Sequence, residues 1–125
     1  CALALAEEGA HVVINGRSAD SLAQAEAAVR AVATGTVTAI AADVTTPEGR
    51  AALLAAAPTP DILVNNAGGQ FPSPLSAITQ KGWETVVRTN LTGGFLVARE
   101  TYNQFHHLAR TAAANSAEEA LSRLN

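Results

Sequence analysis

The sequence predicts an α/β fold built on a doubly wound parallel sheet. Strand-like runs at residues 11–14, 36–42 and 62–64 are short, and stretches long enough for helices separate them. Each run is largely apolar rather than alternating, as expected for parallel strands that helices cover on both faces. Each run also ends in small or polar residues, and ligands of such sheets bind outside the carboxyl ends of the strands.

Local signals set the ends of the first two predicted helices. Residues 1–8 look like the back half of a helix, and Gly9 suits the position just beyond its C-terminus. Ser18 or Asp20 can cap the next helix, and Gly35 closes it. That helix carries apolar residues at helical spacing, namely Leu22, Ala25, Val29 and Val32.

The third predicted helix starts at Thr46, whose hydroxyl can cap it. Pro47 occupies the first helical position and Glu48 places a carboxylate in the first turn. Prolines within residues 58–60 end the helix, because proline cannot continue it. Residues 62–64 then form the third predicted strand.

A fourth helix begins near Thr79, and its spacing places Asn90 on the face predicted to be buried. That face consists of Trp83, Val87, Asn90, Gly94 and Ala98, widened by Val86, Leu91, Phe95 and Tyr102. By position alone, Asn90 is a hydrogen-bonded core amide. The tail, residues 111–125, is predicted to be a separate helix capped by Asn115 or Ser116.

Composition excludes several classes of function. With 48% hydrophobic and 15% charged residues, the chain is globular rather than disordered. A net charge of −3 gives no basic face for nucleic acid, and no apolar run is long enough to cross a bilayer. The single cysteine, Cys1, fits a reducing cytoplasm. No metal site is expected, because the adjacent His106 and His107 point in different directions on a helix and no thiol or acidic pair joins them.

The three strand exits differ in how strongly they indicate a binding site. Asn15-Gly16-Arg17-Ser18 alone is a turn, and Asp43 alone is a loop carboxylate. Asn65-Asn66-Ala67-Gly68 is harder to dismiss, because two adjacent amides after a buried strand need hydrogen-bond partners. Glycine at that place also lets the backbone approach a flat ligand.

These motifs together resemble the short-chain dehydrogenase/reductase family over about residues 1–105. The resemblance rests on Gly16-Arg17, Asp43-Val44, Asn65-Asn66-Ala67-Gly68 and Thr89-Asn90-Leu91, each in the expected order along the chain. It implies a Rossmann domain that binds NADP(H). The cofactor-binding residues that it implies are Arg17, Ser18, Asp43, Val44, Asn66, Ala67 and Gly68.

The resemblance also implies a role for individual residues. Asp43 would accept from the adenine amino group with the Val44 backbone beside it, and the Asn66-Ala67-Gly68 backbone would lie along the ribose while the Asn66 amide holds the central strands. Arg17 would contact the 2′-phosphate of NADP, since a guanidinium fork matches phosphate and Gly16 replaces an acid that would repel it.

Asn90 matches the catalytic asparagine of the family, which fixes a water beside the catalytic lysine. Residues 69–74, 81–83 and 89–93 are similar to the branch of peroxisomal-type trans-2-enoyl-CoA and dienoyl-CoA reductases, which implies an acyl-CoA substrate. The outer face of the fourth helix pairs with a neighbouring subunit in the family, so a homo-oligomer is implied by analogy.

The sequence departs from the family in two ways. The single tyrosine, Tyr102, is followed four residues later by His106 rather than lysine, so no Tyr-x-x-x-Lys pair exists. The glycine-rich turn and the first strand of the family would precede Cys1. We therefore expect a partial dinucleotide-binding domain at residues 1–110 with exposed strand edges, and a tail at 111–125 unlike the family. Two hypotheses remain: an NADP(H)-dependent oxidoreductase, or a remnant or interaction module without activity.

Overall fold

The computed structural model of the chain describes residues 1–122, apart from the side chains at 117, 118, 120 and 121. Its elements in chain order are α1 (Ala2–Glu7), β1 (Val12–Gly16), α2 (Ala19–Arg30), β2 (Val37–Ala41), α3 (Pro47–Ala56), the 3₁₀ turn η1 (Leu75–Ala77), α4 (Gln80–Val87), the π-helical segment η2 (Arg88–Gly93) and α5 (Gly94–Ser122). Residues 123–125 of the predicted tail lie outside the described residues.

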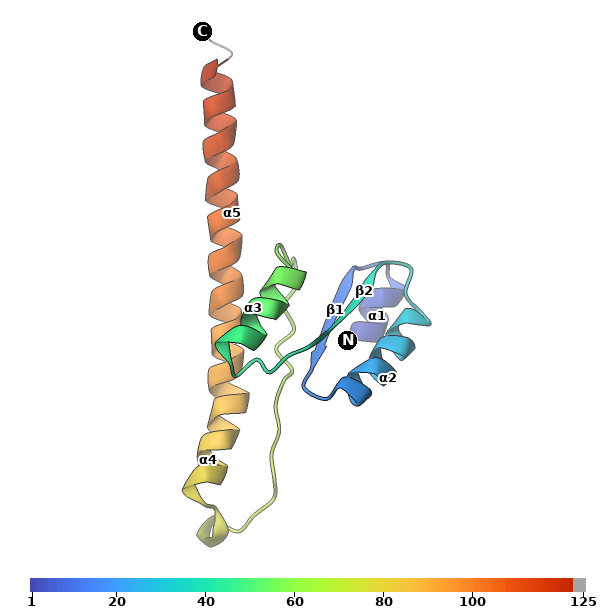
Figure 1. The fold of residues 1–125 in the computed structure, drawn as a ribbon, viewed down its shortest axis with the longest axis vertical. Coiled ribbons are helices and arrows are strands. Elements are labelled where there is room, and N and C mark those ends of the chain that lie inside the picture. The colour runs from blue at the N-terminus through green and yellow to red at the C-terminus, as the bar shows by residue number, and fades with distance from the viewer. Residues whose placement is uncertain (123–125) are drawn as a thin grey trace.

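The two strands form a parallel sheet, which confirms the predicted α/β fold class. Strand β1 pairs with β2 in a register that sets Val12 opposite Val37 and Gly16 opposite Ala41. Ala6 of α1 and Val29 of α2 pack with Val12 and Val37 into the core of this half of the molecule. Figure 1 shows α1 and α2 beside the strands, and α3, α4 and α5 as a second group joined to them by the chain after β2.

The predicted starts of α2 and α3 are confirmed by their hydrogen bonds. Ser18 accepts from the Ser21 N–H at 3.4 Å, and Thr46 accepts from the Gly49 N–H at 3.1 Å. Gly9, just beyond α1, has a φ of 87°, which explains glycine at that position. The predicted end of α2 is wrong: the helix ends at Arg30, and Gly35 instead lies so close to the Ala10 carbonyl that a Cβ would come within 2.6 Å of it.

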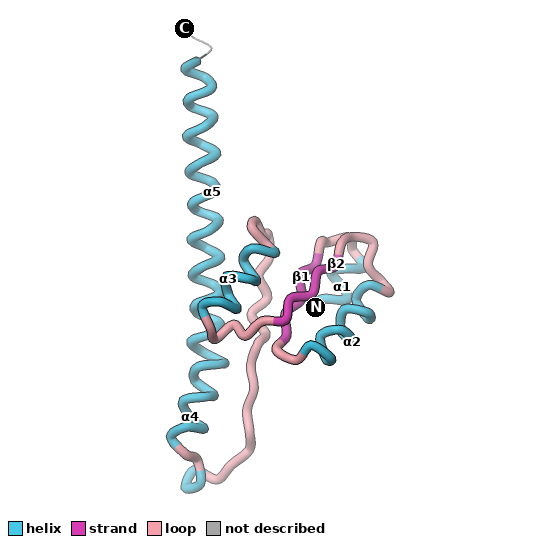
Figure 2. Tube along the Cα trace, in the orientation of Figure 1, coloured by secondary structure: helices cyan, strands magenta, loops and turns pink. Residues whose placement is uncertain are grey.

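The third predicted strand is absent from the described residues. Ile62, Leu63 and Val64 are 65%, 41% and 50% exposed and lie in an extended connection between α3 and α4. Figure 2 shows this connection as a long loop that runs down to α4. A strand is completed by hydrogen bonds to a neighbouring strand, and this segment pairs with neither β1 nor β2, the two strands of the described sheet. The apolar character of residues 62–64 was therefore not sufficient to predict a strand.

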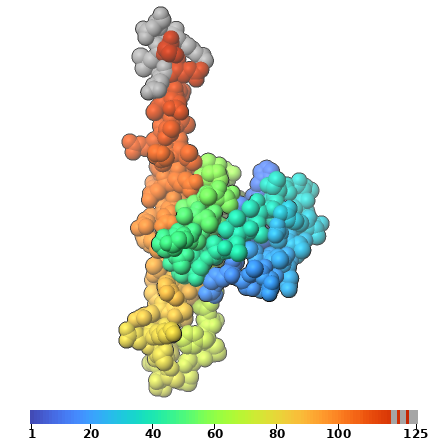
Figure 3. All heavy atoms as spheres, viewed as in Figure 1, coloured from blue at the N-terminus to red at the C-terminus, as the bar shows by residue number. Residues whose placement is uncertain are grey.

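The predicted tail helix is wrong in its start, because α5 is continuous from Gly94 to Ser122. Asn115 and Ser116 are helix-interior residues rather than caps, and His106 and His107 also lie well inside the helix. No glycine or proline interrupts this alanine-rich stretch, so helix propensity carries the chain through it. In Figure 3 the last turns of α5 extend beyond the other elements.

The buried face of the α4–α5 helix is also not the predicted one. Gly93 and Val97 are buried, whereas Trp83, Phe95 and Tyr102 are 62%, 59% and 61% exposed. Both faces carry apolar residues, so spacing does not decide which of them packs. Asn90 consequently lies on the exposed side rather than in the core. Within the described residues, no helix combines the length and the apolar character needed to cross a bilayer.

Candidate functional site

The exits of β1 and β2 bring Arg17 and Asp43 together. Because the strands are parallel and Gly16 stands opposite Ala41, the residues that follow them leave the same edge of the sheet. Arg17 is exposed and makes no hydrogen bond or close ion pair with the described residues, so its guanidinium is available to a ligand. Ser18, the next residue, is engaged as the cap of α2.

The charge of Asp43 is held by its own turn. The pKa of Asp43 is lowered, first because the Thr45 N–H donates to its Oδ1 at 2.9 Å, and next because of the Thr45 hydroxyl beside it. Partial burial acts in the opposite direction, and the positive charges of Arg17 and Arg88 lower the pKa further. Asp43 is therefore an acceptor within the electrostatic reach of two cations.

The rest of this turn is fixed by backbone contacts. The Thr46 N–H and hydroxyl both donate to the Asp43 carbonyl at 3.0 Å. Val44 is buried, and its carbonyl accepts from Arg50 Nη1 at 3.1 Å. The turn that was predicted to hold adenine is thus well ordered by its own residues and by α3.

Asn15 is a contributor that sequence reasoning missed, since it was interpreted as part of a turn. Its amide Nδ2 donates to the carbonyls of Ile40 and Ala42, each at 3.0 Å. An amide at a strand end next to a parallel partner is the signal that points to this role. Asn15 ties the end of β1 to the end of β2 and so fixes the spacing between Arg17 and Asp43.

The segment that follows residues 62–64 contacts the π-helical segment η2 through Asn90. The Asn90 Oδ1 accepts from the Gly69 N–H at 3.0 Å, and its Nδ2 donates to the carbonyls of Gly69 and Val86 at 2.7 and 2.9 Å. A Cβ at Gly68 would come within 2.5 Å of the Asn90 oxygen, so a larger residue there would push the Asn90 side chain out of these hydrogen bonds. Asn90 lies in the π-helical segment η2, a local distortion of the long helix.

Asn66 and Ala67 lie exposed in this segment. The expectation that the Asn66 amide holds central strands is not met, because the neighbouring segment forms no strand and the Asn66 side chain has no hydrogen bond among the described residues. Its side-chain amide is exposed, so it needs no partner within the protein.

Two shallow hollows connect these parts. One, of about 330 Å³, is lined by Gly68, Gly69, Gln70, Val86 and Asn90. The other, of about 130 Å³, is lined by Arg17, Gly69, Gln70, Phe71, Thr85, Val86 and Thr89. Arg17 from the β1 exit therefore borders the same surface as the glycine-rich segment, although the two lie far apart in the sequence.

The polar groups on this surface suit a phosphate-bearing nucleotide. It offers an available guanidinium, a carboxylate acceptor and an exposed backbone that runs through glycines. The described residues contain no group of three or more His, Cys, Asp or Glu side chains that could hold a metal ion.

Comparison with known proteins gives a family match. The family model described as short chain dehydrogenase matches residues 1–115. Gluconate 5-dehydrogenase of Gluconobacter oxydans (strain 621H) is 38% identical over 99 residues, covering 76% of this chain and 38% of that protein. Versicolorin reductase 1 of Aspergillus parasiticus is 38% identical over 121 residues, covering 92% and 45%.

Solved structures agree with the fold. L-sorbose reductase from Gluconobacter frateurii, complexed with NADPH and L-sorbose, superposes with a TM-score of 0.72 at 29% identity. The match covers 83% of this chain and 42% of that one. The chain thus spans less than half the length of the relatives it matches.

Proposed function

Because this chain belongs to the short chain dehydrogenase family, we propose that it forms the adenosine-binding part of an NADP(H)-dependent oxidoreductase. The observation that carries this proposal is the convergence of Arg17 and Asp43 at one sheet edge, beside the hollow bordered by Gly69. In the proposed complex Arg17 contacts the 2′-phosphate and Asp43 accepts from the adenine amino group. The backbone of Val44 and of residues 66–68 lies along the nucleoside, and Ser18 supports Arg17 by fixing the start of α2.

The preference for the phosphorylated coenzyme rests on charge. Arg17 follows Gly16, so no carboxylate stands at the strand end to repel a phosphate. Arg88 adds a second cation, because it too acts on Asp43. The NADPH complex of the L-sorbose reductase relative supports the same coenzyme by analogy.

Titration of the chain with NADPH and with NADH, followed by nucleotide fluorescence, tests this proposal. Replacement of Arg17 by alanine should weaken NADPH binding about tenfold or more, the value of a hydrogen bond to a charged group, and leave NADH binding unchanged. Arg30→Ala is the matched control, because Arg30 is already paired with Glu26 at 2.6 Å on α2. Equal losses for both coenzymes in Arg17→Ala would contradict the assignment of the 2′-phosphate contact.

Hydride transfer in the family needs an arrangement of catalytic residues that these 125 residues do not show. NADPH supplies the hydride, and family chemistry adds a serine, a tyrosine and a lysine that polarise and protonate the substrate. Tyr102 has His106 rather than lysine four residues on. We therefore expect the 125-residue chain to bind coenzyme without turnover. Asn90 is the proposed catalytic residue of the chain, acting where a complete site supplies the lysine.

The substrate is proposed to be a small molecule, and two classes have support. An acyl-CoA thioester is supported by the resemblance of residues 69–74 and 81–83 to enoyl-CoA reductases. A sugar or sugar acid is supported by the names of the relatives, which include gluconate 5-dehydrogenase and L-sorbose reductase. Activity assays of the gene product that carries the complete site, with crotonyl-CoA and with gluconate as alternative substrates, discriminate between them. A reducing cytoplasm stays the predicted location.

A remnant or interaction module is the second candidate, favoured by the missing Tyr-x-x-x-Lys pair. Saturable binding of NADPH by the wild-type chain would count against it. The absence of any coenzyme binding by a folded chain would favour it over the oxidoreductase.

Association of two copies through α5 is proposed by family analogy and supported by an exposed apolar stripe. Leu91, Phe95, Tyr102 and Phe105 recur at helical spacing and are 67%, 59%, 61% and 55% exposed. Light scattering after size-exclusion chromatography measures the mass. Phe95→Lys should shift a dimer to monomer, whereas Glu119→Lys, beyond this stripe, should not.

A further inference from the structure

The structure contains a buried arginine that neither the sequence analysis nor the proposed coenzyme contacts explain. Arg50 of α3 is 6% exposed and is the one charged residue found buried among the described residues. Arginine is rarely buried unless its charge is paired and its N–H groups are hydrogen-bonded. The contacts of Arg50 therefore indicate what compensates for burying its charge.

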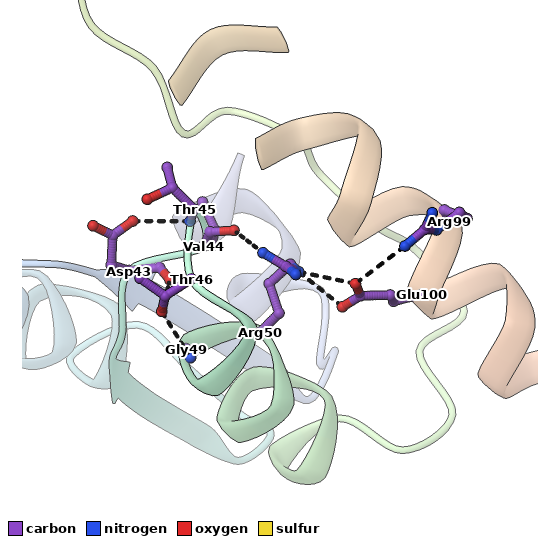
Figure 4. A network of polar contacts seen from close by, with 8 residues as sticks. All are labelled: Asp43, Val44, Thr45, Thr46, Gly49, Arg50, Arg99 and Glu100. Carbon is purple, nitrogen blue, oxygen red and sulfur yellow. Dashed lines mark hydrogen bonds and ion pairs between the residues drawn. The ribbon is translucent and has the colours of Figure 1, made fainter. Parts of the chain in front are cut away.

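Arg50 connects three parts of the chain (Figure 4). Its Nε lies 3.0 and 2.9 Å from the two carboxylate oxygens of Glu100 on α5. Its Nη1 donates to the carbonyl of Val44 at 3.1 Å, in the turn that follows β2. One guanidinium thus holds the β2-exit turn (residues 43–45) against α3 and α5.

The contact with Val44 is placed where the proposed coenzyme site needs it. Val44 lies between Asp43, the proposed adenine acceptor, and Thr45, whose N–H donates to Asp43. The Val44 carbonyl is buried, so without the donor from Arg50 it would be left unpaired. The turn would then have to move to expose this carbonyl to water, and Asp43 would move with it.

We infer that Arg50 is a positioning residue that fixes the β2-exit turn for the adenosine moiety of the coenzyme, with Glu100 orienting the guanidinium. The nucleotide part of this inference rests on the proposed function. Only arginine suits the position, because its planar fork offers separate donors to the carboxylate and to the carbonyl, whereas the single ammonium of lysine does not span both.

A positioning role differs from a purely structural one in a way that can be measured. Buried ion pairs are frequently replaceable by apolar residues of similar volume without loss of stability. The double variant Arg50→Met/Glu100→Leu therefore removes the Val44 contact while keeping the packing and leaving no buried charge unpaired. The matched control is Arg99→Ala, since Arg99 lies 3.7 Å from Glu100, is half exposed and has no contact with the turn.

The test combines NADPH titration with amide hydrogen exchange at Thr45 and Thr46. We expect the double variant to stay folded, to bind NADPH about fivefold more weakly, as for the loss of one hydrogen bond, and to exchange both amides faster. Arg50→Lys should show the same two changes, and Arg99→Ala neither. Unchanged affinity and unchanged exchange in the folded double variant would overturn the inference.

The two proposals fail separately. If the wild-type chain binds no NADPH, the proposed function fails, and the exchange of the Thr45 and Thr46 amides decides the role of Arg50. Faster exchange in the folded double variant, or in Arg50→Lys should the double variant not fold, still supports the positioning role. Exchange at the wild-type rate in the folded variant refutes it.

Discussion

Replacement of Gly49 by alanine tests whether the β2-exit turn is packed as tightly against α3 as the structure has it. A Cβ built at Gly49 collides with the Asp43 carbonyl oxygen and comes within 2.8 and 2.9 Å of the Asp43 carbonyl carbon and nitrogen. These are backbone atoms, so they have no rotamer with which to yield. Alanine in a helix is ordinarily favoured over glycine by about 1 kcal/mol, and here the collision opposes that gain.

The size of the effect follows from the bonds that the collision disturbs. Overpacking costs about 1–3 kcal/mol, and the Asp43 carbonyl also accepts two hydrogen bonds from Thr46, each with a net value of about 1 kcal/mol. After the gain in helix propensity is subtracted, we expect Gly49→Ala to lose about 2–4 kcal/mol of unfolding free energy.

Urea denaturation followed by far-ultraviolet circular dichroism measures this loss, and Gly94→Ala is its matched control. The nearest atom to a Cβ at Gly94 is the Asn65 side-chain carbon at 3.9 Å, an ordinary contact. Gly94→Ala should therefore stabilise the chain by up to about 1 kcal/mol. A folded Gly49→Ala variant as stable as the wild type would refute the packing of Asp43 against α3.

Three further changes probe the same sheet edge. Thr46→Ala should destabilise the chain by about 1 kcal/mol, because the hydroxyl that caps α3 through the Gly49 N–H is lost. Asn15→Ala should cost about 1–3 kcal/mol, because two strand-end carbonyls lose their shared donor. The lowered pKa of Asp43 means that its charge, held by Thr45, stabilises the fold above the ordinary value of 3.8, and this contribution disappears as the pH falls below 3.8 through the folded value.

Chemical denaturation at fixed pH measures the first two changes, with the exposed residues Thr38 and Gln24 replaced by alanine as controls. If Thr46→Ala or Asn15→Ala is as stable as its control, the proposed contribution of the corresponding hydrogen bonds to stability is wrong. For Asp43, the difference in unfolding free energy between the wild type and Asp43→Asn is followed from neutral to acid pH. It should shrink in acid, and a difference that grows there would reverse the sign of the argument.

Local chemistry made several elements of this protein predictable. Thr46 followed by Pro47 predicted the start of α3, and Ser18 predicted the start of α2, because a capping hydroxyl acts on an N–H only three residues away. The closeness of Arg17 and Asp43 was also predictable, since consecutive parallel strands leave the same edge of a sheet.

Other features depend on partners that sequence does not reveal. Residues 62–64 are as apolar as a buried strand, yet they pair with neither β1 nor β2 and stay exposed. The long helix carries apolar residues on two faces, and the one containing Gly93 and Val97 packs while the one containing Phe95 stays exposed. Spacing alone favoured the second face.

The sequence by itself determined the starts of α2, α3 and α4, the parallel α/β class and the family to which this chain belongs, because these depend on neighbouring residues and on motifs that follow one another along the chain. Only the tertiary structure decided that Arg50 is buried against Glu100 and Val44. It also decided that Asn90 is exposed and hydrogen-bonded to Gly69, instead of being buried in the core. The Arg50–Glu100 and Asn90–Gly69 contacts join residues 50 and 21 positions apart. Which distant groups meet depends on how the helices pack, and that is a property of the folded chain as a whole.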